Sequence, residues 1–151
     1  MPQKGALGSA LASVDRCAEA STDALLLVGR ILIALLFLLT AWFGSPNAGY
    51  LKFLGYPSPD ALSVVAIIVE YLIIISLVFG VATRIGALLG IAFVVLATVT
   101  AHRYWTYPEA AQQQVNWIYL TKNLAILGGL VVLFVSGAGR YALDAVWRGK
   151  S

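Results

Sequence analysis

Residues 61–80 read ALSVVAIIVEYLIIISLVFG, an apolar run that contains one charged side chain, Glu70. A helix that crosses the hydrocarbon core of a bilayer needs about 20 residues. Lipid offers the backbone no hydrogen-bonding partner, so the segment must be helical there, although its valines and isoleucines would favour a strand in water. The run therefore predicts a transmembrane helix with a carboxylate near its middle, where an ionised group costs roughly 2.5–3.5 kcal/mol.

Three other segments match this one in length and apolar character. They are residues 24–43, 84–102 and 117–136. Arg30 lies within the first of them and Lys122 within the last. Across the chain 60% of residues are hydrophobic and 11% are charged, about half the charged share of a soluble domain. We therefore expect an all-α, polytopic membrane protein in which residues 24–136 form an antiparallel bundle of four transmembrane helices.

The segments outside these helices differ from them in composition. Residues 44–60 are rich in Gly, Pro, Asn and Ser, which indicates a loop, and residues 103–116 are polar and aromatic. Residues 1–23 lack the long apolar core of a signal peptide, so we expect a polar tail, with or without a short interfacial helix. Residues 137–151 are expected to form a juxtamembrane tail.

The distribution of lysine and arginine predicts the orientation. The two tails and the loop between the second and third helices carry six of these residues, whereas the other two loops carry two. Basic residues are enriched in cytoplasmic loops. Both termini are therefore expected in the cytoplasm, and the chain is expected to be a multi-pass protein of the inner (cell) membrane.

Several kinds of site are excluded by composition. One cysteine, Cys17, cannot form an intramolecular disulfide or a dithiol relay within the chain. One histidine, His102, cannot supply both axial ligands of a haem. No Cys, His and carboxylate groups are spaced as in a zinc site, and a scattered net charge of +3 does not indicate nucleic-acid binding. No catalytic or metal-binding residues are therefore predicted.

Ionisable and amide side chains inside the membrane form a candidate buried polar cluster. It comprises Arg30, Glu70, Lys122 and Asn123. At 1.5 Å of rise per residue, Lys122 lies about 5 Å from Glu70 in depth and Arg30 about 6–7 Å. A polar stripe with spacing i, i+3 and i+7 runs along the fourth helix. Its members are Asn116, Tyr119 and Asn123. We expect Glu70 to point into the bundle, where Lys122, Arg30 or both hold it.

This cluster has two interpretations. It is either a buried ion pair that fixes helix register, or a site for a proton, a quinone head group or a polar substrate. Lys122 alternatively extends outward to the headgroups. His102 is either a residue at the membrane interface or part of a proton or ligand site. Two further candidates for that site are Asn116 and Tyr119.

Glycines and charged residues mark expected contacts and helix ends. Small residues let helices approach closely in lipid, so four glycines are expected at helix contacts. They are Gly86 and Gly90, in a G-x-x-x-G pattern, and Gly128 and Gly129. The glycines of GAGRYALD, residues 137–144, are expected to end the fourth helix. Arg84, Arg140 and Asp144 are expected to anchor the chain at the inner headgroups, with Asp144 paired to one of the two arginines.

Four stretches follow one another along the chain: GRILIALLFLL (29–39), VEYLIIISLVFGVATR (69–84), HRYWTYPEAAQQQVNWIYLTKNLAILGGL (102–130) and GAGRYALD (137–144). Together they resemble the DoxX family of small four-helix membrane proteins, over residues 25–144. The last stretch is similar to the family's usual G-x-G-R-Y-S-L-D ending, with Ala138 where proline is common. Many members have Gly-x-x-Lys near the end of the first helix, where this chain reads TAWFGS (40–45). By position, the family's recurrent polar residues correspond to Arg30, Glu70, Arg84, His102, Lys122, Asn123, Arg140 and Asp144.

The resemblance also implies a field of function. The family is named after a subunit associated with thiosulfate–quinone oxidoreduction, and other members are linked to oxidative-stress complexes or to processing of metal-binding peptides. We therefore expect an accessory subunit of a membrane redox or oxidative-stress system, with a quinone as candidate cofactor and the bilayer and redox proteins as partners, and we do not class it as an enzyme. The alternatives are a small transporter or proton-coupled carrier acting as a homo-oligomer, and a scaffold without chemistry of its own.

Overall fold

The computed structural model describes residues 3–43 and 48–148, and every element of secondary structure within them is helical. The elements are α1 Gln3–Phe43, α2 Ala48–Phe53, α3 Pro59–Phe79, α4 Thr83–Ala101, the 3-10 helix η1 Tyr104–Thr106, α5 Ala110–Ser136 and α6 Leu143–Arg148. Four of these, α1, α3, α4 and α5, are long and apolar enough to cross a membrane. The expectation of an all-α chain with four such helices is confirmed. Residues 44–47 of the expected first loop and residues 149–151 of the expected carboxyl tail lie outside the described residues.

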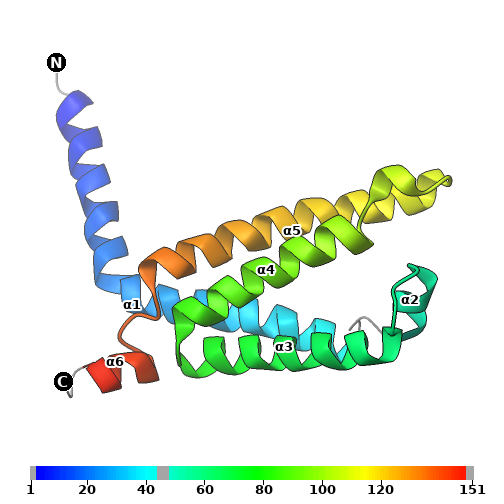
Figure 1. Ribbon diagram of the computed structural model, residues 1–151. Helices are drawn as coiled ribbons and strands as arrows, with labels where there is room; N and C mark the ends of the chain where they lie inside the picture. The colour runs from blue at the N-terminus through cyan, green and yellow to red at the C-terminus, as the bar shows by residue number, and fades with distance from the viewer. Residues whose placement is uncertain (1–2, 44–47, 149–151) are drawn as a thin grey trace.

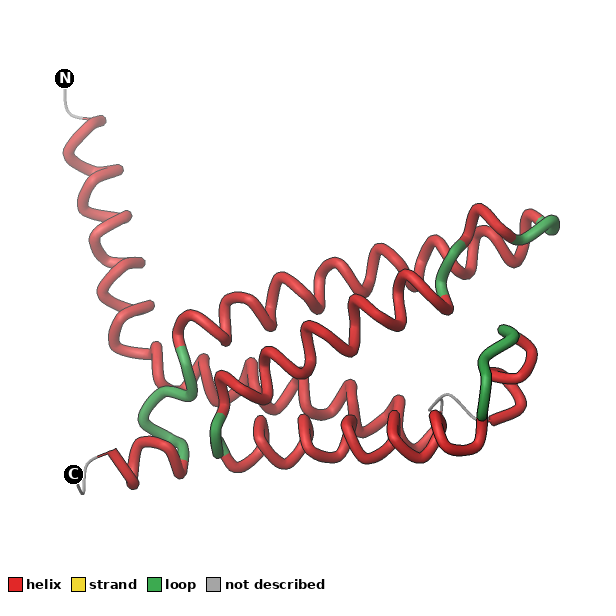
Figure 2. The backbone as a smooth tube through the Cα atoms, viewed as in Figure 1, coloured by secondary structure: helices red, strands yellow, loops and turns green. Residues whose placement is uncertain are grey.

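The four long helices pack as one bundle. Helix α1 packs against α3 and α5, and α4 also packs against α3 and α5. The turn between α3 and α4 lies at the same end of the bundle as α6, here called the α6 end (Figure 1). The opposite end, here called the α2 end, holds α2 and η1 (Figure 2). Loops and short helices therefore gather at two ends, with the apolar helices between them.

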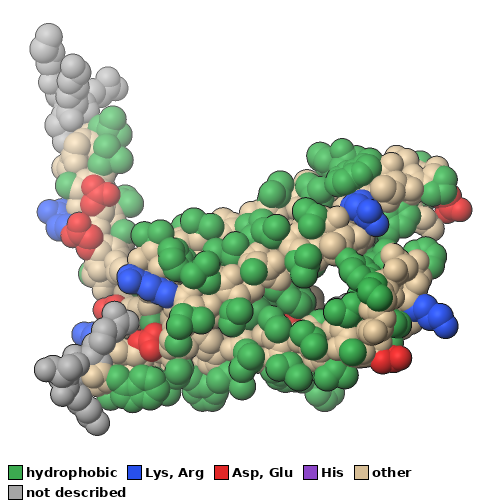
Figure 3. All heavy atoms as spheres, in the orientation of Figure 1, with side chains coloured by type: hydrophobic (Ala, Val, Ile, Leu, Met, Phe, Trp, Pro, Cys, Tyr) green, Lys and Arg blue, Asp and Glu red, His purple; other side chains and the backbone are tan. Residues whose placement is uncertain are grey.

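Apolar side chains form both the core and the outer surface of the bundle. Phe37 of α1, Leu77 of α3 and Leu130 of α5 are buried. Large apolar side chains are also exposed on every long helix, among them Leu32, Leu72, Leu96 and Val132. Hydrophobic side chains cover much of the visible bundle surface in Figure 3. Soluble proteins rarely expose apolar patches of this extent, so this surface suits acyl chains.

Three of the four glycines expected at helix contacts lie at such contacts. A Cβ added at Gly86 would lie 2.1 Å from Ser76 Oγ of α3, and one at Gly90 would lie 3.1 Å from Leu130 Cδ2 of α5. At Gly129 the nearest atom is Ile33 Cδ1 of α1, at 3.4 Å. The expectation is wrong for Gly128, where a Cβ would meet no atom within 4 Å.

Two helices extend beyond their expected starts. Helix α1 begins at Gln3 rather than at residue 24, so the expected polar tail is continuous with the first span. Helix α5 begins at Ala110 rather than at residue 117. Alanine and glutamine are good helix formers, and the two extensions contain several of them. The expected loop at 44–60 also contains α2.

Candidate functional site

Glu70 is buried inside the bundle, as the sequence predicted, and is only 1% exposed. It projects from α3 toward α1, where Thr40 Oγ1 lies 3.0 Å from Glu70 Oε1. The same hydroxyl lies 2.9 Å from the carbonyl oxygen of Phe37, so its single hydrogen can serve either acceptor. A hydroxyl on α1 thus contacts the carboxyl group of α3, and sequence reasoning had not identified Thr40.

Arg30 is also fully buried, but it lies far from Glu70. Its Nη2 donates a hydrogen bond to the carbonyl oxygen of Tyr141 at 2.5 Å, and a Cβ added at Gly80 would lie 2.1 Å from its Nη1. Glu70 lies on α3 and precedes Gly80, the residue directly after that helix, by ten residues, which is about 15 Å of rise. The expected contact between Arg30 and Glu70 is therefore wrong.

Lys122 is exposed on the outside of α5, and it does not pair with Glu70. Its Nζ lies over the Tyr119 ring, 4.9 Å from the centroid. Neighbouring residues of a helix point about 100° apart, because each turn holds 3.6 residues. Asn123 takes the inward position, and Lys122, about 100° around the helix from it, lies on the exposed side of α5.

Asn123 joins α5 to α4 inside the bundle. It is 8% exposed, and its Nδ2 donates a hydrogen bond to Thr98 Oγ1 at 2.9 Å. The Thr98 hydroxyl in turn donates to the carbonyl oxygen of Val94 at 2.6 Å. The two side chains thereby link α5 to the backbone of α4. Thr98 had not been identified from the sequence, because a threonine in an apolar run carries no distinctive signal.

His102, Asn116 and Tyr119 come together, as expected, at the start of α5. The Nδ1 atom of His102 lies 3.4 Å from Asn116 Oδ1, and the rings of His102 and Tyr119 are 5.0 Å apart. The Asn116 amide nitrogen also donates to the carbonyl oxygen of Gln112 at 3.0 Å. Close by, the hydroxyls of Tyr50 and Tyr107 both donate to the carbonyl oxygen of Ala101, at 3.2 and 3.5 Å.

These contacts form three polar pairs along the bundle: Thr40–Glu70, Thr98–Asn123 and His102–Asn116. Phe37, Gly90 and Leu130 meet at one level of the core, which serves as a reference. Counting from that level at 1.5 Å per residue, the pairs lie about 5, 11 and 20 Å toward the α2 end. Figure 3 shows an opening toward that end, between the α4–α5 pair and the α1–α3 pair.

At the α6 end, the carboxylate of Asp144 binds the start of α4. Its Oδ1 accepts the backbone N–H of Ala82 at 2.8 Å, and its Oδ2 accepts that of Thr83 at 3.0 Å. The backbone N–H of Asp144 donates to the carbonyl oxygen of Gly80 at 2.9 Å. The expected pairing of Asp144 with Arg84 or Arg140 is replaced by these backbone contacts, which satisfy N–H groups that a helix start leaves free.

The two expected arginine anchors bind elsewhere at the α6 end. Arg84 Nη2 donates to the carbonyl oxygen of Val135, near the end of α5, at 3.1 Å. The backbone N–H of Arg140 donates to Asp23 Oδ1 of α1 at 2.7 Å, and its Nε lies 3.9 Å from Asp23 Oδ2. A hydrogen bond to the Tyr141 hydroxyl raises the pKa of Arg140. The predicted helix stop is confirmed, because α5 ends at Ser136 and Gly137 has a positive φ of 76°.

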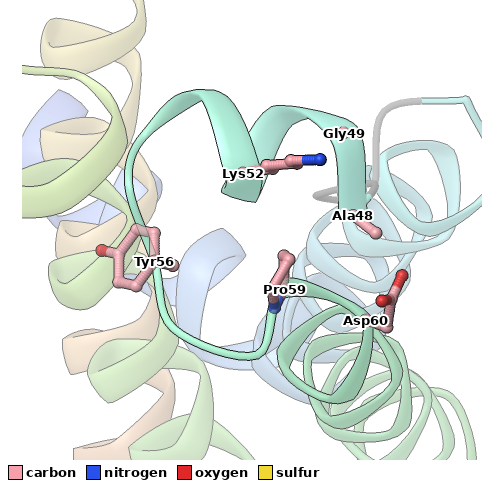
Figure 4. A pocket seen from close by; sticks show the side chains of 6 residues that line it. All are labelled: Ala48, Gly49, Lys52, Tyr56, Pro59 and Asp60. Carbon is pink, nitrogen blue, oxygen red and sulfur yellow. The ribbon is translucent and has the colours of Figure 1, made fainter.

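A separate pocket of about 520 Å³ lies at the α2 end (Figure 4). It is lined by Ala48, Gly49, Lys52, Tyr56, Pro59 and Asp60. Its two charged residues, Lys52 and Asp60, are exposed, so water screens them. In the described part of the chain, no three His, Cys, Asp or Glu side chains are grouped to hold a metal ion.

The chain is similar to known membrane proteins. A family model described as DoxX matches residues 25–103. Over 132 residues the chain is 32% identical to the inner membrane protein YphA of Escherichia coli (strain K12), an alignment that covers 83% of this chain and 91% of that protein. It is 30% identical to the inner membrane protein YqjF of the same organism, with 85% and 95% covered. No solved structure gives a significant match.

Proposed function

The chain belongs to the DoxX family, and from this premise we propose that it is an accessory subunit of an inner-membrane redox or oxidative-stress system. The observation that carries the proposal is the buried Glu70, which contacts Thr40. Of the three polar pairs, this one lies farthest from the α2 end and deepest in the bundle. Ionisable groups inside a membrane are costly, and they commonly mark paths for protons or polar ligands. The site therefore suits a partner whose chemistry takes up protons within the membrane.

A quinone is the ligand class that this arrangement suits best. Reduction of a quinone to a quinol consumes a pair of electrons and a pair of protons. The electrons would come from the redox centre of a partner oxidoreductase. Glu70 and His102 are the members of the three pairs that can each release and regain a proton. The chain would thus bind the quinone head and move protons, while the partner moves electrons.

The proposal includes an antiparallel bundle with both termini in the cytoplasm. The short turn between α3 and α4 and the arginines at the α6 end, Arg84 and Arg140, support this orientation. The native thiol of Cys17 tests it with a membrane-impermeant maleimide. Labelling is expected only after the inner membrane is permeabilised, whereas in a Cys17→Ser background Lys52→Cys should react in cells whose inner membrane is intact. The reverse pattern would overturn the orientation.

Gentle extraction from native membranes tests the quinone proposal directly. We expect the purified protein to retain membrane quinone and to copurify with an oxidoreductase. Glu70→Gln should lower quinone retention, because the amide cannot exchange a proton. Asp60→Asn, which changes an exposed carboxylate on the same helix, is the matched control and should retain it. Absence of both quinone and oxidoreductase from the wild-type preparation would refute the proposal.

A proton-coupled carrier is the second candidate, because the three polar pairs follow one another toward the opening at the α2 end. Four helices make a thin bundle, so a carrier would act as a homo-oligomer. Proteoliposomes with an imposed pH gradient distinguish the two candidates. Gradient-driven uptake of a polar solute that Glu70→Gln abolishes would favour the carrier, and uptake equal to that of empty vesicles would discard it.

A further inference from the structure

The first part of α1 projects away from the bundle as an exposed helical arm, defined here as residues 7–22. Every side chain in this arm is exposed. Figure 1 shows α1 bending sharply, so that the arm runs steeply across the direction of the bundle. The Thr22 hydroxyl donates to the carbonyl oxygen of Ala18 at 2.9 Å, a local contact that often bends helices. If the bundle crosses the bilayer, the arm runs close to the plane of the membrane.

The arm has an apolar face and a charged face. Leu7, Leu11 and Val14 follow the spacing i, i+4 and i+7, and they are 65%, 57% and 65% exposed. On a helical projection, Arg16 and Glu19 fall away from this stripe. Figure 3 shows the same division, with hydrophobic side chains of the arm on the side that faces the bundle and charged side chains on the other side. The apolar face therefore points toward the level of the membrane.

The apolar face continues into a groove at the bend. The groove has a volume of about 500 Å³ and lies between α1 and α5. Its lining residues on the α1 side include Ala18, Leu25 and Ile33, and those on α5 include Gly129 and Val132. Thr22 and Arg30 also line the groove, but its other lining residues are apolar or glycine. Arm and bundle therefore present one continuous, largely apolar surface on the inside of the bend, which acyl chains from a single leaflet can cover.

We propose that the arm lies on the membrane surface as an interfacial amphipathic helix, with Leu7, Leu11 and Val14 inserted into the leaflet at the α6 end. Its occupant is phospholipid, and the acyl chains of that leaflet also fill the groove. The arm carries one arginine and two acidic residues, so anionic headgroups do not attract it, and burial of apolar area holds it in place. This inference rests on the membrane-spanning bundle and is independent of the proposed redox role.

Single-cysteine labelling of the full chain tests the arm directly. In a Cys17→Ser background, Val14→Cys places a solvatochromic fluorophore on the apolar face, and Ala12→Cys places it on the charged face as a matched control. The protein is reconstituted in vesicles of phosphatidylcholine, and in vesicles that also contain phosphatidylglycerol. The label at position 14 should emit at shorter wavelength, be quenched by spin-labelled lipid and resist aqueous iodide. The label at position 12 should behave in the opposite way, and both should be unchanged by phosphatidylglycerol.

Other outcomes would overturn the proposal. If iodide quenches both labels equally, the arm stands in water. If the label at position 14 resists both quenchers, and Val14→Cys forms disulfides between copies, the occupant is a second copy of the chain. Adding Leu11→Glu to the Val14→Cys protein should move that label into water. Continued quenching by spin-labelled lipid in that variant would show that the apolar stripe does not hold the arm.

Discussion

The carboxylate of Asp144 accepts the backbone N–H of Thr83 at 3.0 Å, so a residue near the carboxyl end of the chain satisfies an N–H group in the first turn of α4. The other carboxylate oxygen accepts the N–H of Ala82, a residue with a left-handed φ of 47°. Non-glycine residues rarely adopt this conformation. The GAGRYALD segment therefore stabilises the turn between α3 and α4, in addition to ending α5.

Replacing Asp144 should destabilise the α6 end. Asp144→Ala removes an acceptor from two N–H groups, and loss of a helix cap typically costs about 0.5–2 kcal/mol. Unfolding of the purified protein in mixed micelles measures the change. Asp15→Ala, which removes an exposed carboxylate in the arm, is the control and should fall within about 0.5 kcal/mol of wild type. Equal stability of the two variants would contradict the capping role.

Two glycines should respond in opposite ways to a methyl group. Gly80 has a φ of 65°, and a Cβ there would lie 2.1 Å from Arg30 Nη1 and 2.4 Å from Ala142 Cβ. Gly80→Ala should therefore lower stability by about 1–3 kcal/mol. Gly128 lies within α5 and faces open space, so Gly128→Ala should be neutral or stabilising by up to about 1 kcal/mol. Thermal unfolding of the two variants checks the pair, and tolerance of alanine at position 80 would contradict this packing.

Lys122 and Glu70 should behave as independent positions. Because Lys122 is exposed over Tyr119, Lys122→Leu should change the free energy of unfolding by no more than about 0.5 kcal/mol. The effect of Glu70→Leu should then be the same with or without Lys122→Leu, as expected for side chains that do not touch. A double-mutant cycle gives this comparison. A coupling energy above about 1 kcal/mol would restore the ion pair that the sequence predicted.

The stability contributed by Tyr50 should depend on pH in the alkaline range. Burial, together with the nearby Tyr107 hydroxyl, raises the pKa of Tyr50 to about 12. An unfolded tyrosine has a pKa of 10.0, so this contribution is complete below pH 10 and is lost as the pH rises through about 12. Tyr50→Phe should flatten that decline and should remove a phenolate that appears near pH 12 in an alkaline absorbance titration. Loss of a phenolate that appears near pH 10, the ordinary range of tyrosine, would show instead that the hydroxyl is not held at the end of α4.

Hydropathy alone was enough to predict the four long helices, because a lipid environment leaves an apolar segment of about 20 residues no alternative to a helix. It also identified Glu70 as buried, since an acidic side chain at mid-depth would be costly if it faced the acyl chains. The depth of each residue in the membrane, estimated from the rise per residue, could not identify Thr40 as the residue that contacts Glu70. Depth gives the height of a residue along a helix, whereas contact also requires the rotation of that helix, which packing against its neighbours decides.

The amino-acid sequence by itself determined that this chain is helical, that four of its helices suit a membrane, and which family it resembles. Only the tertiary structure decided that Asn123 points inward while Lys122 points outward, and that Arg30 lies beside Tyr141 rather than Glu70. The physical reason is the same in both cases. Hydrophobicity is a property of a single segment. The partner of a polar side chain depends on how each of several helices is rotated about its own axis in the packed bundle.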